Sequence, residues 1–229
     1  MSRRRSQSGM TLVELSVGVL ILGIVMAATL ASFTSASRGS VGAGLRIENL
    51  NEAQLLMESA SKDLRTAAPL VAGQAPFPTD PGNPLQVLAT SDDVTFYADL
   101  NTSGVPNQVR LYVDRTDPKN PLLKETVLKP NNPLATPLTY NITVANPLKL
   151  RLVGQYIVNP STMPVLSYED DSGNILPVPL LATDATKVRA IDIQFQVRKQ
   201  TNQAVKATTV INRVRLPNVI YSLLAGASS

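Results

Sequence analysis

The amino-acid sequence predicts an α+β protein in which a long N-terminal α-helix is followed by a β-rich domain with an antiparallel sheet. An uncharged apolar run from Leu15 to Ser37 begins the helical part, and an amphipathic period continues it to about residue 68. Beyond residue 84, short runs with strand character are separated by prolines and turn residues. A helical part followed by strands, without alternation between the two, is typical of the α+β class.

The composition excludes several classes of active site. The chain has 229 residues and contains no histidine and no cysteine. It therefore lacks the Ser-His-Asp and Cys-His nucleophilic systems, the usual zinc ligands and disulfide bonds. Carboxylates alone can catalyse, but no catalytic constellation stands out in the sequence. We predict a protein that is not an enzyme and that holds neither a cofactor nor a metal.

Residues 10–37 have the length and composition of a transmembrane helix. The 23 positions from Leu15 to Ser37 carry no charge. As a helix they would extend about 34 Å, against a hydrocarbon core about 30 Å thick. Because the basic run Arg3–Arg5 precedes them, the positive-inside rule places the N-terminus in the cytoplasm and the rest of the chain outside. The expected location is the inner (cytoplasmic) membrane, crossed once.

Three simpler interpretations of this segment fit less well. A cleaved secretory signal has an apolar region of about 7–15 residues and a small-residue cleavage site, whereas this run is longer and lacks that site. A twin-arginine export signal is suggested by Ser2-Arg3-Arg4, but the apolar residues expected just after the arginines are missing. A plain membrane anchor leaves Glu14 unexplained, because a carboxylate in a spanning helix costs up to about 2.5–3.5 kcal/mol at the bilayer centre.

Glu14 gains a natural partner if the chain is cut after Gly9. The cut would give Met10 a cationic α-amine, four residues before the carboxylate. In a staggered bundle of helices, Glu14 of one subunit could then neutralise the amine of its neighbour. An intramembrane acid usually has such a partner, so this pairing gives the carboxylate a function in assembly.

The string GMTLVEL at residues 9–15 resembles the type IV prepilin motif, since it follows a short basic leader and precedes an unbroken apolar helix. The resemblance implies that residues 1–9 are a cytoplasmic leader peptide, removed by a prepilin peptidase that cuts after Gly9. It also implies that Met10 becomes the N-methylated first residue and that Glu14 is needed for filament assembly. Methionine at position 10 departs from the commoner phenylalanine of the family.

Residues 38–68 are predicted to continue the helix as an amphipathic segment. Steps of three and four separate its apolar and small residues, which places them on one helix face. We expect this face to pack on the sheet, and Pro69 to end the helix. The expected stripe contains Ala43, Ile47, Leu50, Ala53, Met57, Ala60, Leu64 and Ala67.

The remaining chain is predicted to hold a proline-rich connection and a β-rich globular domain. Residues 69–84 contain five prolines and two glycines, which indicates an ordered but irregular connection. Residues 85–229 form the β-rich domain, with strands that build an antiparallel sheet. The expected strands are Val94–Leu100, Gln108–Asp114, Leu122–Leu128, Thr139–Val144, Lys149–Val158, Pro164–Tyr168, Val188–Val197 and Lys206–Leu216.

Three further segments resemble a narrower group, the PilW-type minor pilins and the J-type minor pseudopilins of type II secretion. A helix ending in Asp63-Leu64-Arg65 is similar to theirs. The strand Pro164–Tyr168 with the acidic turn Glu169–Asn174 is similar to their strand–turn–strand feature, and Val214–Asn218 to their last strand. The clustered oxygens of the acidic turn could bind Ca²⁺, although ordinary turn chemistry explains the same residues.

Charge is distributed unevenly over the exported part of the chain. Residues 38–109 carry four basic and eight acidic side chains, and residues 110–229 carry fourteen basic and eight acidic ones. DNA uptake is a role found in the superfamily, and a basic face could contact DNA phosphates. The basic residues are dispersed without interleaved aromatics, which favours charge complementarity between subunits.

The resemblance implies a structural minor subunit, a prepilin or pseudopilin, of a type IV pilus or a type II secretion-like filament. Its expected partners are other pilins or pseudopilins, the prepilin peptidase/methyltransferase and the membrane. After processing, the subunit would leave the inner membrane for an extracytoplasmic filament or the cell surface. The alternative is a filament-displayed binding module, an adhesin or a DNA-uptake receptor, with DNA or a surface ligand as its partner.

Overall fold

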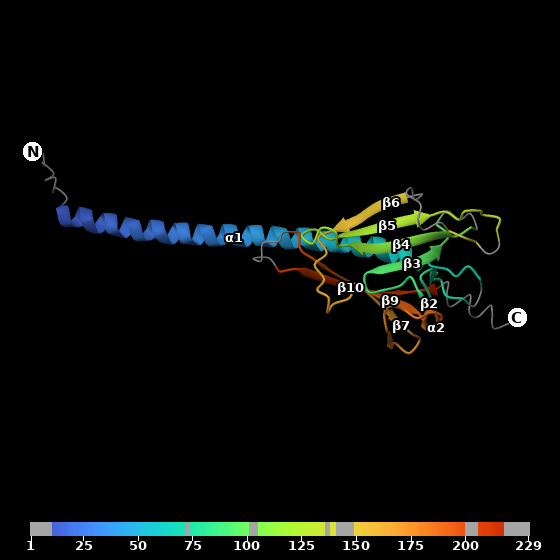
Figure 1. The fold of residues 1–229 in the computed structure, drawn as a ribbon. Coiled ribbons are helices and arrows are strands. Elements are labelled where there is room, and N and C mark those ends of the chain that lie inside the picture. The colour runs from blue at the N-terminus through green and yellow to red at the C-terminus, as the bar shows by residue number, and fades with distance from the viewer. Residues whose placement is uncertain are drawn as a thin grey trace, which may run out of the picture. The chain divides into compact units, whose positions relative to one another are not determined.

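The computed structural model describes residues 11–71, 74–100, 105–135, 138–140, 149–199 and 206–217. It confirms the α+β class: one long helix, α1 (Leu12–Arg65), precedes antiparallel sheets (Figure 1). The chain divides into two compact units, Met1–Leu45 and Arg46–Ser229.

The first unit contains the uncharged part of α1. Every side chain of the helix up to Val41 is exposed, including large apolar ones such as Leu20 and Ile24. The sequence favours helix here because no proline interrupts it before Pro69. An apolar surface of this extent is stable only against lipid or against other protein.

The second unit buries one face of α1, but this face differs from the predicted stripe at its N-terminal end. The stripe is confirmed from Ala53 onward, whereas Ile47 and Leu50 are 59% and 41% exposed. The polar Asn49 takes the inward position instead, because its side-chain oxygen accepts a hydrogen bond of 2.9 Å from the Lys199 amide. The buried residues of α1 are Asn49, Ala53, Leu56, Met57, Ala60, Ser61 and Leu64.

The helix ends close to the expected proline and runs directly into strand pairing. The Thr66 amide donates to the Asp63 carbonyl, which closes the last turn. Ala67 then forms a bridge with Ala98, and the Ala68 amide donates to the Tyr97 carbonyl at 2.8 Å. Because Ala68 precedes a proline, extended backbone is favoured there.

The first sheet is an antiparallel meander with the strand order β3-β4-β5-β6. Consecutive strands are neighbours, as short connections favour. Along β5 buried and half-buried residues alternate, as expected for a strand with one face on the core. The strands are Asp93–Ala98 (β3), Asn107–Asp114 (β4), Leu122–Leu128 (β5) and Lys149–Gln155 (β6).

The sequence predicted one antiparallel sheet, but the structure has a second four-stranded sheet beside the first. Its strand order is β10-β9-β7-β8. All of its described pairings are antiparallel. An isolated bridge between Ile157 and Val197 links the chain just after β6 to the end of β9. The strands are Leu166–Glu169 (β7), Ile175–Leu176 (β8), Ala190–Val197 (β9) and Thr208–Arg215 (β10).

Three short elements were not predicted. The two-stranded sheet of β1 (Thr79–Asp80) and β2 (Asn83–Val87) begins inside the proline-rich connection that we expected to be irregular. The short helix α2 (Ala182–Ala185) was also missed, whereas the short β8 is the strand that the resemblance implied after the acidic turn. Of the expected strand Thr139–Val144, Tyr140 forms only an isolated bridge with Pro130, and residues 141–148 lie outside the described part.

The second half of α1 contacts both four-stranded sheets. The Asn212 side chain of β10 donates to Ser61 Oγ at 2.9 Å, and the Arg151 side chain of β6 donates to Ser59 Oγ at 2.7 Å. Leu56 and Leu64, which flank these two serines in the sequence, are fully buried in one core cluster shared with both sheets. The helix therefore supplies the common core of the second unit.

Gly154 permits the close approach of β6 to α1. A Cβ atom at this position would lie 2.5 Å from Leu56 Cδ2 and 2.8 Å from Leu56 Cγ. The first distance is well below van der Waals contact, so a larger residue would force the leucine or the strand to move.

We predict that Gly154→Ala lowers the free energy of unfolding by about 1–3 kcal/mol, the usual cost of overpacking a core. Urea unfolding of the full chain in detergent micelles, followed by circular dichroism, measures it. Gly82→Ala is the control, since a Cβ there meets only Asp80 Oδ1 at an ordinary 3.4 Å. In a Leu56→Ala background the cost of Gly154→Ala should shrink, and an undiminished cost would show that the two positions do not compete for space.

Candidate functional site

The first turn of α1 is closed by reciprocal hydrogen bonds between Thr11 and Glu14. The Thr11 amide and its hydroxyl donate to Glu14 Oε2 at 2.9 Å and 3.0 Å. In return, the Glu14 amide donates to Thr11 Oγ1 at 3.2 Å. This is a capping box, in which each of the two residues satisfies an amide that the helix leaves unpaired.

The structure describes one of the three residues predicted for processing and assembly. Glu14 lies exposed in the first turn of α1, whereas Gly9 and Met10 lie outside the described part. The sequence interpretation treated Glu14 only as a charge for a neighbouring subunit and missed its role as a cap. The signal was present, because Thr-x-x-Glu before an apolar run is the pattern of a capping box.

Directly after this cap, α1 contains a segment long and apolar enough to cross a membrane. An 18-residue window has a mean hydropathy of 2.3 and none of it is buried. The carboxylate of Glu14 therefore lies at the boundary between a polar terminus and an apolar helix.

Residues 4–30 match the family model described as the prokaryotic N-terminal methylation motif. The chain carries a pilin-type methylation motif. The matched residues include Gly9, Met10 and Glu14. The motif supports a type IV pilin-like prepilin, which fits single-pass anchoring in the inner membrane, assembly with other pilins and processing by a prepilin peptidase. No curated protein and no solved structure matches the chain.

In the second unit, a charged cluster joins the end of α1 to the first sheet. Arg151 of β6 donates to Asp63 Oδ2 at 3.0 Å and also pairs with Glu125 of β5. Lys149 Nζ lies 3.3 Å from Glu125 Oε1. The side chain of Glu125 is only 2% exposed. We call these four residues the α1–sheet joint.

The two carboxyls of the joint interact, and their pKa values shift in opposite directions. Burial, followed by the hydrogen bond and the like charge of Glu125, raises the pKa of Asp63 to about 7, although Arg151 and Lys149 oppose the shift. Burial also disfavours the charged form of Glu125, but hydrogen bonds from Asp63 and Arg151 outweigh it and lower the pKa of Glu125. Asp63 is therefore the member that takes up a proton first as the pH falls.

A hollow of about 410 Å³ lies beside the second sheet and is lined by Arg65, Arg213, Arg215 and Pro217. Arg213 is held by Glu169 and by Asp192, whose Oδ1 lies 3.0 Å from Arg213 Nε. Within the described part of the chain, neither Arg65 nor Arg215 forms an ion pair. Two cations are therefore available to an external anion.

The acidic turn after β7 was correctly predicted as a turn between two strands. Asp170 accepts hydrogen bonds from the amides of Ser172 and Asn174 and from the Asn174 side chain, at 2.8–2.9 Å. Gly173 has a φ of 82°, which favours glycine. Glu169 forms an ion pair with Arg213. Two acids of the turn thus already have partners within the chain.

The joint predicts a pH-dependent stability. The folded pKa of Asp63, about 7, lies above its ordinary value of 3.8, so the folded chain binds this proton more tightly than the unfolded chain. The stabilisation is complete below about pH 4 and is lost as the pH rises through about 7. Between pH 5 and pH 8 the free energy of unfolding should fall by about 1–2 kcal/mol more than in Asp63→Asn, after allowance for solvent screening.

Urea unfolding of the full chain in micelles at the two pH values measures this difference. The control is Asp92→Asn, which breaks a more exposed ion pair with Arg115 and should keep the wild-type dependence on pH. An unchanged dependence in Asp63→Asn would contradict the raised pKa of Asp63.

Proposed function

We propose that this chain is a structural minor subunit, a minor pilin or pseudopilin, of a type IV pilus or a type II secretion-like filament. The observation that carries the proposal is the methylation motif at residues 4–30, placed at the start of a helix whose apolar 18-residue window is not buried. In this proposal residues 1–9 are removed after Gly9, and Met10 becomes the methylated N-terminus. The basic run Arg3–Arg5 keeps that end in the cytoplasm until the subunit is assembled.

The exposed half of α1 supports a change of environment during assembly. Lipid can cover its apolar side chains before assembly, and the helices of neighbouring subunits can cover them afterwards. Because lipid and helix interiors are similarly apolar, this transfer gains little from the hydrophobic effect, and close packing and polar pairing must drive it. Glu14 is the only charged residue between Met10 and Arg38 and thus the source of that pairing.

Glu14 has two alternative partners in this proposal. In the single subunit its carboxylate accepts the Thr11 amide and hydroxyl. In a filament its surroundings would be dry, where an unpaired charge costs several kcal/mol. The Met10 amine of a neighbour offsets that cost only in the correct axial register, so the pair selects register as well as contributing attraction.

The Asp-Leu-Arg element, on which part of the resemblance to the minor pilins rests, lies where the helix meets the β-rich part. Asp63 and Arg65, from the Asp-Leu-Arg element, contribute to the α1–sheet joint and to the arginine-lined hollow respectively. Leu64 between them is fully buried. The element therefore joins the helix to the β-rich part rather than forming a solvated helix end.

We predict that Glu14→Gln leaves the protein inserted in the membrane and cleaved after Gly9, yet largely absent from sheared filaments. Glutamine can still form a capping box, so this variant removes the charge and keeps the cap. Thr11→Ala is the matched control: it weakens the cap by about 0.5–2 kcal/mol and keeps the charge, and it should remain in filaments. Immunoblots of membrane and sheared fractions, with mass spectrometry of the N-terminus, measure these outcomes.

Gly9→Val should fail at an earlier step and accumulate uncut precursor. Recovery of Glu14→Gln in filaments at wild-type amounts would overturn the register argument. An intact Met1 terminus in the filament-associated wild-type protein would overturn the processing step itself.

The second candidate is a filament-displayed binding module that retains DNA, and the hollow lined by Arg65, Arg213 and Arg215 favours it. Arg65→Gln combined with Arg215→Gln should weaken retention of duplex DNA. The slope of log affinity against log salt concentration should fall by the amount expected for the loss of about two phosphate contacts. The control is Arg110→Gln, since Asp93 already holds that guanidinium. Retention at graded salt measures the effect, and equal retention by both variants would exclude this hollow as the DNA contact.

A further inference from the structure

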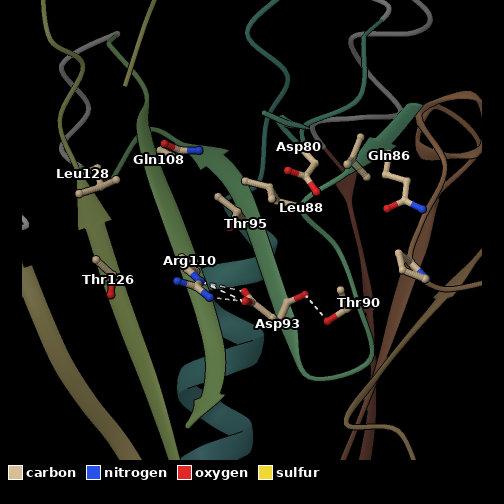
Figure 2. A pocket seen from close by; sticks show the side chains of 12 residues that line it. Asp80, Gln86, Leu88, Thr90, Asp93, Thr95, Gln108, Arg110, Thr126 and Leu128 are labelled. Atoms are coloured by element: carbon tan, nitrogen blue, oxygen red, sulfur yellow. Dashed lines mark hydrogen bonds and ion pairs between the residues drawn. The ribbon is translucent and has the colours of Figure 1, made fainter. Parts of the chain in front are cut away.

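A cleft of about 390 Å³ lies on the outer face of the first sheet, at β3, β4 and β5. Its lining residues Gln108 and Thr126 alternate along their strands with Val109 and Val127, which belong to the buried core. Figure 2 shows the cleft with the lining side chains in front of the strands and a helix behind them. The cleft is within the usual size range of small-ligand sites, about 300–1,000 Å³.

The floor of the cleft holds a polar group that lacks a partner. Gln108 on β4 is 4% exposed, and its side-chain oxygen is fully buried without a hydrogen bond from any described residue. A buried acceptor without a donor is unfavourable and rare in folded proteins. A ligand that brings an N–H or O–H donor would satisfy this oxygen.

The charges around the cleft indicate which donor fits. Asp93 is neutralised by Arg110, whose Nε and Nη2 donate to its carboxylate at 3.1 Å and 2.5 Å. Asp80 accepts the Gly82 amide at 2.8 Å, but it forms no ion pair with any residue that the structure describes. One carboxylate remains uncompensated, which disfavours anionic ligands such as phosphates and favours a cation.

The walls of the cleft are aliphatic. Leu88, which directly follows β2, and Leu128 of β5 line it, and Pro179 lines it from the second half of the chain. No aromatic ring is found among the described lining residues, so the cleft lacks the flat apolar surface on which a sugar ring would stack. Aliphatic walls suit instead the methylene stem of a long side chain, whose charged end remains polar.

We propose that this cleft binds a primary ammonium group carried on an aliphatic chain, the chemistry of a lysine side chain. An ammonium offers three donors and no acceptor, which matches the unpaired oxygen of Gln108 and the uncompensated carboxylate of Asp80. The stem lies between Leu88 and Leu128. The inference does not depend on the filament role, because every residue that it uses belongs to the β-rich unit.

The test uses the isotope-labelled full chain in micelles of a detergent whose headgroup carries neither an amine nor a sugar. Nα-acetyl-lysine methylamide is titrated at constant ionic strength, and NMR follows the amide signals of β3, β4 and β5. Saturable shifts centred on Gln108 are expected. The matched probe is the same compound acetylated at Nε, which keeps the stem and removes the charge, and it should cause no saturable shift.

Two variants tie the binding to the named atoms. Asp80→Asn should weaken binding about tenfold, since it removes the charge from a charge-assisted contact. Gln108→Leu should abolish binding and stabilise the unliganded chain, because the orphaned acceptor is gone. The control is Asp114→Asn, which removes the partner of Lys124 outside the cleft and should leave the affinity unchanged.

Pentane-1,5-diamine separates the two sources of the ammonium. Equal binding of the diamine and the lysine probe assigns the cleft to any alkylammonium, and preference for the lysine probe assigns it to a lysine of a partner protein. Saturable binding of the Nε-acetylated probe or of methyl glucoside would overturn the ligand class. Absence of binding, or binding that both cleft variants retain, would overturn the site.

Discussion

The burial of one face of α1 against two sheets is the constraint on which the second unit depends. Ala53, Leu56, Ala60 and Leu64 are fully buried on that face and share one core with both sheets. Alternation of alanine with leucine leaves room for close approach, which Gly154 of β6 completes by having no Cβ. Because two sheets share one helix, a shift of α1 along its axis would disturb both.

Polar contacts set the position of that helix more specifically than apolar packing does. Asn49 accepts the Lys199 amide at one end of the buried face, and Asp63 meets Arg151 at the other. A buried charge is costly unless it is paired, and the joint meets this requirement because the cations Arg151 and Lys149 face its two carboxyls. The cost of misplacing these groups makes the register of α1 unique, as apolar contacts alone would not.

The two halves of α1 have different surroundings. Glu14, at the start of the first half, is the residue to which the proposed function assigns subunit pairing. The first half of α1 has no partner within the described chain and requires lipid or neighbouring helices. At the start of this half, Thr11 and Glu14 close the helix and keep the carboxylate satisfied in a single subunit. In the proposed filament, a neighbouring subunit must offer Glu14 a better partner than this cap.

The sequence by itself determined the features that depend on local interactions. The uncharged run, the end of the helix near Pro69, the turn at Asp170 and seven of the strands follow from residues close in the chain, and Glu14 was recognisable as a charge out of place. Only the tertiary structure decided the division into two sheets and the burial of Asn49 on the inward face of α1. It also decided the α1–sheet joint and the cleft at Gln108. Each of these depends on partners far apart in sequence, such as Asp63 and Arg151, whose meeting is set by strand pairing and by the cost of leaving buried polar groups unpaired.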